Sequence, residues 1–542
     1  MSDGFVTVAQ CVEGLPQGRF VWELLFCGFL AWFMLGAINE STPLAFSYVT
    51  AEWPMSERHL SLMSAALALG NFLAVLLGGW AADLYGRTAV IRPALLLTAS
   101  CGMVLQTART FFQALLARFL LGLVSGALLG VLPPLIAELL PARNRGFYLT
   151  VWMSGWPAGA LLSVLVGCLS PGLNWRAFHT ALLVPAIVVY VCLRAEMLPE
   201  SPRFLYLVGR RDEGYNTLLD IYEKEQLPLP WPAEAIAVTS APPRGQGSES
   251  SLSSSSSCHP ACKRALSSNV GVALRLALAM LLTSAAAQSL KIWMPVVLLR
   301  HAPEPADSAA TAAGLLGDSL HSMHGGVLRD RLQMVPGANA AGAAGAVASL
   351  LSLVPNQAAQ SNHFVILVLA QAYIVQLLGT IFCAYASTWV RRKQMVQWSL
   401  PLAAIMTLLA VAVAESGYVF LCGPLVGLQL TAQFCSLNFL LIFAAEHFPT
   451  SRRAAVVGLA CLAAQLGDFI TPILGGLVIQ RVSKAGATLF FSALYVVAWL
   501  VASRLPLPSS RERPLHDVEE PKGSKEGAAR QRKREYMTYQ TI

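Results

Sequence analysis

Long apolar stretches separated by short polar loops make up most of this chain of 542 residues. A helix needs roughly 20 mostly apolar residues to cross the hydrocarbon core of a membrane, because each backbone polar group must be satisfied inside the segment. Twelve stretches meet this requirement, six on each side of a polar segment. The pattern predicts an all-α membrane protein with twelve transmembrane helices in two six-helix bundles. The predicted spans are residues 20–39, 61–82, 89–108, 111–137, 147–168, 178–198, 270–299, 363–387, 394–414, 417–445, 454–479 and 485–504.

The segments between and beside these spans are polar. Residues 199–268 connect the two bundles, and we predict short helices there, followed by a disordered part around the serine run Ser248–Ser257. Such a run cannot bury enough apolar surface to offset the entropy of ordering. A second long loop, at 301–362, is rich in Ala, Gly and Ser. The predicted organisation is an N-terminal segment at 1–19, bundles at 20–198 and 269–504, a linker at 199–268 and a disordered basic tail at 505–542.

Composition and charge placement fit a membrane protein and give it an orientation. Charged residues are 13% of the chain, about half the share usual in soluble proteins. Lys and Arg in short loops mark the cytoplasmic side, which predicts cytoplasmic termini and an extracellular or lumenal 301–362 loop. The net charge of +8 then reflects orientation, and we expect the lipid bilayer of a plasma, organelle or vesicle membrane, not nucleic acid, as a partner. The loop residues are Arg87, Arg92, Arg143, Arg145, Arg391, Arg392, Lys393, Arg452 and Arg453.

A charged phrase occurs twice, once in each predicted bundle. "AELLPARNRG" at Ala137–Gly146 and "AEHFPTSRRA" at Ala445–Ala454 both follow an apolar run and share the same spacing of Glu, Pro and Arg. Ahead of them, at comparable offsets, stand "GWAADLYGR" at 79–87 and "AYASTWVRRK" at 384–393. The matching register predicts that the bundles are two copies of one six-helix unit. The shared positions are Glu138, Pro141 and Arg145 in the first copy and Glu446, Pro449 and Arg453 in the second.

Physical chemistry suggests a role for several residues of the stretch "GWAADLYGR". We predict that Gly79 lets another helix approach closely and that Gly86 allows a tight turn between two helices. Asp83 and Arg87 can pair or cap helix ends at the cytoplasmic face.

Together with "RFLLG" at 118–122 and "PESPRFL" at 199–205, these stretches resemble the major facilitator superfamily, on its organic-ion and sugar-porter side. "FVWELLFCGFLAWF" at 20–33 and "FPT" at 448–450 are most similar to the branch of synaptic vesicle glycoproteins. The resemblance implies two bundles that rock about a central site, with access alternating between the two sides. It also implies a cytoplasmic gate made of Gly79, Asp83, Gly86, Arg87, Glu138, Arg145, Glu200, Arg203, Glu446 and Arg453.

The "PESPR" stretch also has a local interpretation. Ser201 can cap a short cytoplasmic helix that has Pro202 in its first turn. We predict that this helix runs to about Tyr222 and that its apolar face consists of Phe204, Leu205, Leu218 and Leu219.

The chain departs from the family pattern at several positions. Thr88 stands where a second basic residue is usual, and the second copy has Thr388 and Ala384 in place of the acid and the glycine. Relatives in the vesicle-glycoprotein branch carry acids at the positions of Leu35 and Ile38, so a cation site built on such acids is not expected here.

Ionisable groups inside a membrane are costly, so each is a candidate functional residue. Arg118, Lys291 and Asp468 qualify, and Lys291 and Asp468 are predicted to lie in one layer of the outer half. Asp468 either exchanges Lys291 for a substrate or proton, or forms a buried pair that only orients helices. Two bases against one acid favour an organic anion or a zwitterion. Uncharged candidates for the lining are Gln288, Gln429, Gln433, Trp152 and Trp156.

Two functions are compatible with this sequence. The first is a secondary active transporter or facilitator of a small organic solute, coupled or not to protons or another ion. The second is a membrane receptor or scaffold that keeps the fold without transporting, which the departures in the second copy and the missing acids at Leu35 and Ile38 favour. We expect a monomer under either function. An enzyme is not expected, because HExxH, GxSxG and nucleotide-binding loops do not occur. We predict no cofactor and no metal, and no glycan at Asn39, whose sequon lies too near the end of the first helix.

Overall fold

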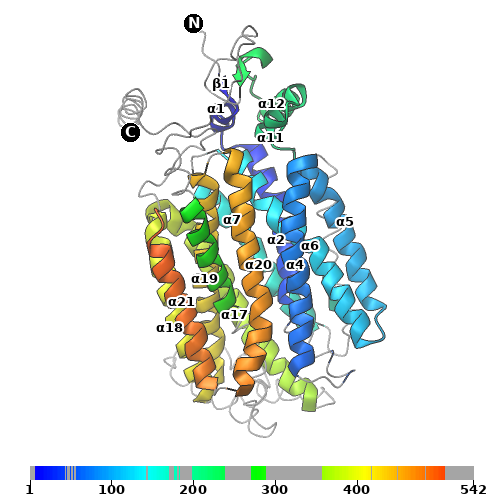
Figure 1. Cartoon of the computed structure of the whole chain (residues 1–542), viewed down its shortest axis with the longest axis vertical. Coiled ribbons are helices and arrows are strands. Elements are labelled where there is room, and N and C mark those ends of the chain that lie inside the picture. The colour runs from blue at the N-terminus through cyan, green and yellow to red at the C-terminus, as the bar shows by residue number, and fades with distance from the viewer. Residues whose placement is uncertain are drawn as a thin grey trace, which may run out of the picture.

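The protein is a bundle of long, nearly parallel helices with a small group of shorter elements at one end (Figure 1). We call that end the linker end, because residues 198–237 lie there. The computed structural model describes residues 6–42, 44, 49, 53, 57–141, 144–169, 176, 178, 179, 182, 198–237, 270–287, 357–416, 418–448, 450–481 and 484–506.

Within these residues, eleven helices are long and apolar enough to cross a membrane, which confirms the all-α class. Most of the predicted sixth span and the part of the seventh beyond Ala287 fall outside the described residues, as do the serine-rich linker and the tail. The bundle consists of α2 (Arg19–Glu40), α4 (Glu57–Tyr85), α5 (Arg87–Gln106), α6 (Phe111–Leu139), α7 (Arg145–Met153) with α8 (Gly155–Leu169), the helix Val270–Ala287, α17 (Gln357–Trp389), α18 (Arg392–Glu415), α19 (Val419–His447), α20 (Thr450–Arg481) and α21 (Lys484–Ser503).

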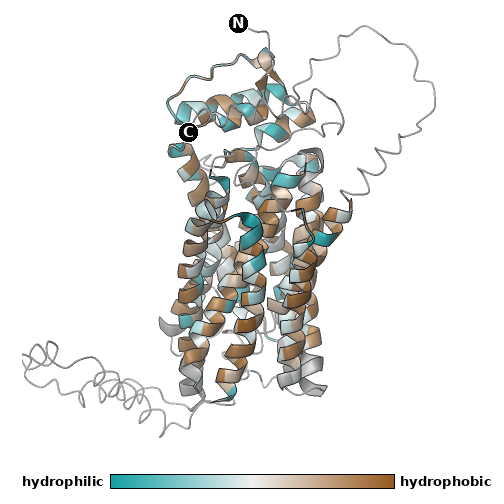
Figure 2. Cartoon of the chain, turned by 90° about the vertical axis from the view of Figure 1, so that its left-hand side faces the viewer, coloured by the Kyte–Doolittle hydropathy of each residue, from teal (hydrophilic) through white to brown (hydrophobic). Residues whose placement is uncertain are grey.

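The bundle is apolar on its outside as well as in its core. Hydrophobic positions cover the outer faces of the helices over most of their length (Figure 2). Large side chains such as Trp80, Phe112 and Trp389 are exposed there. A soluble protein rarely exposes so much contiguous apolar surface, whereas the hydrocarbon of a membrane solvates it at no cost.

The two halves use the same pairing of helices. In the first half α4 packs on α6, and in the second half α17 packs on α19. The third helix of each half, α5 or α18, packs on the same partner, which is the repeat that the sequence predicted. The halves meet where α4 packs against α20 and where α7 and α8 pack against α17.

Glycines bring α2 and α8 into backbone contact. A Cβ atom on Gly159 would collide with the carbonyl oxygen of Phe33, and one on Gly36 would collide with the carbonyl oxygen of Trp156. Small residues at a helix–helix contact allow this close packing, which supplies dispersion energy where the hydrophobic effect is absent.

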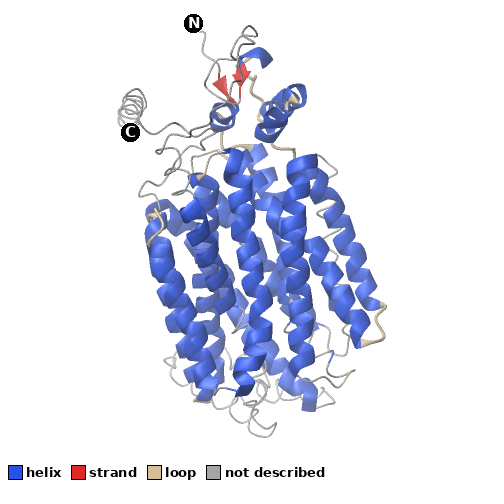
Figure 3. Ribbon diagram, viewed as in Figure 1, coloured by secondary structure: helices blue, strands red, loops and turns tan. Residues whose placement is uncertain are grey.

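A small unit of short elements caps the linker end and joins the N-terminal segment to the linker. It comprises β1 (Val6–Thr7), α1 (Val8–Glu13), α11 (Pro202–Val208), α12 (Arg211–Lys224), the 3-10 turn η1 (Ala233–Ala235) and β2 (Ile236–Ala237). The two strands pair in parallel, with Val6 opposite Ile236 and Thr7 opposite Ala237, and appear as the arrows in Figure 3. The sequence analysis did not predict this pairing, because two-residue strands have no periodic pattern to detect.

The predicted helix after Ser201 begins as expected but does not run continuously to Tyr222. The Ser201 hydroxyl accepts a hydrogen bond from the Phe204 amide, and Pro202 opens the first turn of α11. Gly209, with φ of 89°, then ends α11 in the left-handed region, and α12 starts two residues later. Because of this break Leu219 is exposed, whereas Phe204, Leu205 and Leu218 are buried as predicted.

Hydrogen bonds fix the N-terminal segment to α12. The Tyr222 hydroxyl donates to the carbonyl oxygen of Cys11 at 2.8 Å. Burial raises the pKa of this hydroxyl to about 12, so the donor stays protonated at physiological pH. The Glu225 carboxylate accepts from the amide of Phe20 at 2.7 Å, and so caps the first turn of α2 from 205 residues away in the chain. Gly18 precedes that turn, and a Cβ atom there would collide with the same carboxylate.

Removing this cap is expected to loosen the N-terminal segment. In Glu225→Ala the Phe20 amide loses its acceptor, at a cost of about 1–2 kcal/mol. Limited proteolysis should then cut residues 6–18 several-fold faster than in the wild type. Glu223→Ala, on the exposed side of the same helix, is the matched control and should leave the rate unchanged. Equal rates in both variants would show that Glu225 does not hold the segment.

Candidate functional site

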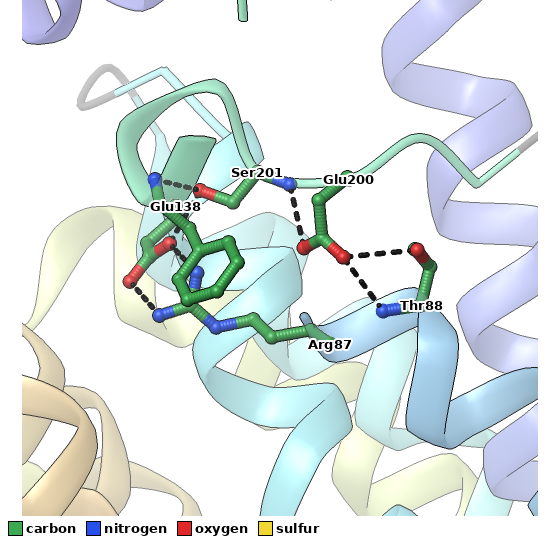
Figure 4. A network of polar contacts seen from close by, with 6 residues as sticks. Arg87, Thr88, Glu138, Glu200 and Ser201 are labelled. Atoms are coloured by element: carbon green, nitrogen blue, oxygen red, sulfur yellow. Dashed lines mark hydrogen bonds and ion pairs between the residues drawn. The ribbon is translucent and has the colours of Figure 1, made fainter. Parts of the chain in front are cut away.

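A buried ion pair joins the third and fourth helices at the linker end. Arg87 begins α5 directly after Gly86, whose φ of 107° makes the predicted tight turn. Glu138 lies in the last turn of α6. The Arg87 guanidinium donates two hydrogen bonds to the Glu138 carboxylate, at 2.6 and 2.9 Å, and both side chains are buried (Figure 4). The Ser201 hydroxyl adds a third donor to Glu138 at 2.5 Å.

A second carboxylate fastens the linker to the start of α5. Glu200 accepts from the amide of Thr88 at 3.0 Å and from its hydroxyl at 2.9 Å (Figure 4). Its other oxygen accepts from the amide of Ser201 at 3.0 Å. Thr88, where the family pattern has a basic residue, therefore takes part in the network as a neutral donor.

The second half contains the equivalent ion pair. Arg392 begins α18 as Arg87 begins α5, and Glu446 lies in the last turn of α19 as Glu138 does in α6. Arg392 and Glu446 are in direct ionic contact, and both are buried. The sequence analysis missed Arg392 as a partner of Glu446, although its place in "VRRK" was the available signal.

Each of the two ion pairs lies within its own half. Other contacts connect the two halves at this end. The Arg392 guanidinium lies against Gly146 of α7, with its Nη2 3.5 Å from where a Cβ atom would stand. The rings of Phe147 and Tyr385 meet edge to face with centroids 5.6 Å apart. We call these two contacts the linker-end seam.

The other predicted gate residues occupy different environments. Arg145 is fully buried and donates to the carbonyl oxygen of Leu140 at 3.2 Å. Arg203 is buried in α11, and the side chain of Arg453 falls outside the described part of α20. Asp83 lies on the exposed face of α4.

One predicted role is wrong in this structure. Gly79 does not provide a close helix approach, since a Cβ atom there would meet nothing within 4 Å. It instead lines a cavity of about 350 Å³ between α4, α6 and α20, whose wall also includes Trp80, Asp83 and Gly458.

A smaller cavity, of about 110 Å³, lies between the two halves, and we call it the central cavity. The wall from the first half is aromatic and apolar, whereas the wall from the second half contains amides, a hydroxyl and a carboxylate. The first wall consists of Trp32, Leu129, Pro133, Met153 and Trp156. The second consists of Met280, Ser284, Gln433, Phe434, Leu437, Asn438, Leu441, Cys461, Ala464, Gln465 and Asp468.

Three of the predicted site residues line this cavity: Trp156, Gln433 and Asp468. Asp468 accepts a hydrogen bond from Ser284 of the helix Val270–Ala287. Two others lie behind the wall. The Gln429 amide donates to the hydroxyl of Tyr495 at 2.6 Å, and Trp152 packs against Trp32 with ring centroids 4.8 Å apart. Gln288 and Lys291 lie outside the described residues.

The cavity wall carries polar atoms that have no partner among the residues that the structure describes. Trp32 Nε1, Gln433 Oε1 and Asn438 Nδ2 are buried with no hydrogen bond among the described residues. Buried polar groups are satisfied in nine cases of ten, so such atoms mark a place for a solute or water. Sequence reasoning missed Asn438, although it lies about one helical turn from Gln433 and Phe434 on α19.

Arg118 is not part of the central cavity. It is buried in α6, where its guanidinium donates to the Thr42 hydroxyl at 2.7 Å and lies 3.2 Å from His179 Nε2. The cavity begins on α6 at Leu129, eleven positions further along, which is roughly 16 Å at the rise of an α-helix.

A buried carboxylate that the sequence analysis did not select lies at the end of α2. Glu40 accepts from Trp156 Nε1 at 2.9 Å and from the hydroxyl of Tyr373 at 3.1 Å. Glu40 was passed over because it ends the apolar run and looked like a boundary residue. Its neighbour Asn39 accepts from the amide of Asn71 at 2.9 Å, which occupies the side chain of the sequon.

The sequence profile of the Major Facilitator Superfamily matches residues 24–370, well over half of the chain. The chain belongs to the major facilitator superfamily. This superfamily consists of transporters, not enzymes, and the fold agrees. A solved structure of the proton:xylose symporter XylE aligns with a TM-score of 0.58 over 90% of this chain and 96% of that chain, at 15% identity.

Curated relatives within the superfamily match part of the chain. The niacin transporter NiaP of Acinetobacter baylyi is 31% identical over 228 residues, which are 40% of this chain and 49% of that protein. Synaptic vesicle glycoprotein 2B of Rattus norvegicus is 27% identical over 247 residues, 42% of this chain and 35% of that protein. The chain thus spans about half or less of the length of these relatives. The match to synaptic vesicle glycoprotein 2B confirms the resemblance to the vesicle-glycoprotein branch.

Proposed function

We propose that this superfamily member carries a small organic solute across a membrane through the central cavity, by alternating access. The observation that supports the proposal is the cavity itself, since both halves contribute a wall and three buried polar atoms in it lack partners within the described part of the chain. A receptor or scaffold that does not transport has no need of a cavity between two halves that can move. Thr88, a departure in the first copy, supplies contacts at the linker end all the same, and Arg392 pairs with Glu446 in the second half. Thr388 and Ala384 remain the arguments for the alternative.

The walls favour a particular kind of solute. A flat molecule could stack on Trp32 and Trp156 of the first wall and present a polar edge to Gln433 and Asn438 of the second. Asp468 is the one carboxylate among the described lining residues, which include no Lys, Arg or His, and it favours a neutral or positively charged solute. The sequence favoured an anionic or zwitterionic solute because Arg118 and Lys291 were both expected at the site. Arg118 lies away from the cavity, and Lys291 lies outside the described residues.

The linker end fits the gate on the cytoplasmic side in this proposal. The ion pairs Arg87–Glu138 and Arg392–Glu446 hold the helices of each half together, and the linker-end seam opens between them. The names of two relatives, a niacin transporter and a proton:xylose symporter, suggest the first solutes and the first coupling ion to examine.

Uptake into proteoliposomes tests the proposal. Nicotinic acid, nicotinamide and xylose are to be supplied with and without a proton gradient, as part of a broad metabolite panel. Asp468→Asn and Gln433→Ala should each lower uptake of a transported solute about tenfold or more, because each removes one interaction of roughly 1.5 kcal/mol or more. Asp220→Asn on exposed α12 is the control. If no solute enters faster than into empty liposomes, the non-transporting receptor becomes the better interpretation.

A further inference from the structure

Glu40 connects the two halves on the side of the central cavity away from the linker end. On α2 it lies eight residues beyond the cavity residue Trp32, which is about 12 Å along the axis. Its carboxylate accepts hydrogen bonds from both halves, from Trp156 of the first and from Tyr373 of the second. Because Trp156 also lines the cavity, Glu40 bonds directly to part of the cavity wall.

One hydrogen bond of Glu40 lies within the first half, and the other connects the two halves. The bond to Trp156 lies within one half, where Gly36 of α2 brings the backbones of α2 and α8 into contact beside it. That packing leaves Trp156 little room to move relative to Glu40. The bond to the Tyr373 hydroxyl, in contrast, connects α2 to α17 of the other half. If the halves move apart on this side, it is the bond to Tyr373 that breaks.

An apolar cluster surrounds this bond and also includes both halves. Ala37, Ala160 and Val164 come from the first half, whereas Leu369, Tyr373 and Val426 come from the second. All six are buried, as is Glu40 itself, so the Glu40–Tyr373 bond is shielded from water. A hydrogen bond to a carboxylate is stronger in such surroundings than in water.

We propose that Glu40 is the latch of an outer gate: its bond to Tyr373 holds the apolar cluster closed over the central cavity, and its release opens the cavity away from the linker end. The proposal rests on the alternating access proposed above and names a positioning residue that regulates it. Trp156 couples the gate to the cavity, because its indole N–H donates to the same carboxylate and its ring lines the cavity.

The test measures opening directly and needs no transported solute. Ala160→Cys places a thiol in the apolar cluster, and its alkylation by a membrane-impermeant maleimide is quantified on its own peptide by mass spectrometry. The reagent is supplied on the side of the membrane away from the linker. Tyr373→Phe removes the donor and keeps the ring, so alkylation should become about 10- to 100-fold faster, the population shift expected for losing a hydrogen bond to a charged group. Glu40→Gln should shift the rate in the same direction.

The matched control is Tyr495→Phe. Tyr495 is an equally buried tyrosine whose hydroxyl bonds to Gln429 within the second half, so its loss should leave alkylation unchanged. Rates within twofold of the parent in both Tyr373→Phe and Glu40→Gln, or an equal rise in the control, would overturn the latch. Because the readout is accessibility, a failed latch leaves the uptake experiment intact. Failure of uptake with an intact latch would count against transport and leave the gate standing.

Discussion

Replacing Glu138 by alanine is expected to destabilise the protein by about 3–5 kcal/mol, because it leaves the buried guanidinium of Arg87 without its counter-ion. Arg87 donates two hydrogen bonds to this carboxylate, and Ser201 donates a third. The variant should unfold at markedly lower temperature or denaturant concentration in detergent, and its uptake should fall with the amount of folded protein. The measurement is thermal or chemical unfolding followed by tryptophan fluorescence.

Two further variants test whether the loss of stability comes from the unpaired buried charge. Glu446→Ala breaks the equivalent pair with Arg392 and should cost a similar amount, since that pair is buried to the same degree. The double variant Arg87→Met with Glu138→Leu removes both charges and should recover much of the lost stability, because apolar residues often replace a buried ion pair without net cost. A single variant that stays within about 1 kcal/mol of the wild type would show that solvent reaches the pair.

Gly159→Ala and Gly79→Ala are expected to have opposite effects on stability, although both add one methyl group to a membrane helix. At Gly159 the new Cβ collides with the backbone of Phe33, which cannot rotate away, so the cost should reach or exceed the top of the range of about 1–3 kcal/mol for an overpacked site. At Gly79 the new Cβ meets open space, and the higher helix propensity of alanine should stabilise α4 by up to about 1 kcal/mol. Unfolding in detergent measures both changes. A loss of stability in Gly79→Ala would indicate that a second conformation brings another helix against this glycine.

The sequence predicted the membrane helices and the repeat well, because both depend on local composition. Twenty apolar residues form a spanning helix almost regardless of context, and a phrase such as "AELLPARNRG" can be recognised wherever it recurs. The β1–β2 pair was missed for the opposite reason, since it depends on a contact between residues 6–7 and 236–237 that no local pattern displays. The break at Gly209 was missed although a glycine at the end of a helix is a local stop signal.

The site was predicted only in part, and the errors have a common cause. Ranking ionisable residues by depth selected Asp468, which lines the central cavity, but also Arg118, which bonds to Thr42 and His179 elsewhere. The same ranking discarded Glu40, which is the last residue of α2 and yet is buried at the contact of both halves. Depth along a helix says nothing about which face of the helix meets which neighbour, and that face is what decides the role of a residue.

The placement of both ion pairs within their own halves bears on the height of the barrier between the two access states proposed above. At the linker-end seam, Phe147 meets Tyr385 through ring edges, and Arg392 reaches Gly146 while it stays paired with Glu446. Separating buried opposite charges would cost several kcal/mol, whereas parting two rings forfeits about 0.5–1.5 kcal/mol beyond their buried area. Neither of these two ion pairs therefore has to break in the proposed cycle, and the speed of interconversion should depend little on ionic strength.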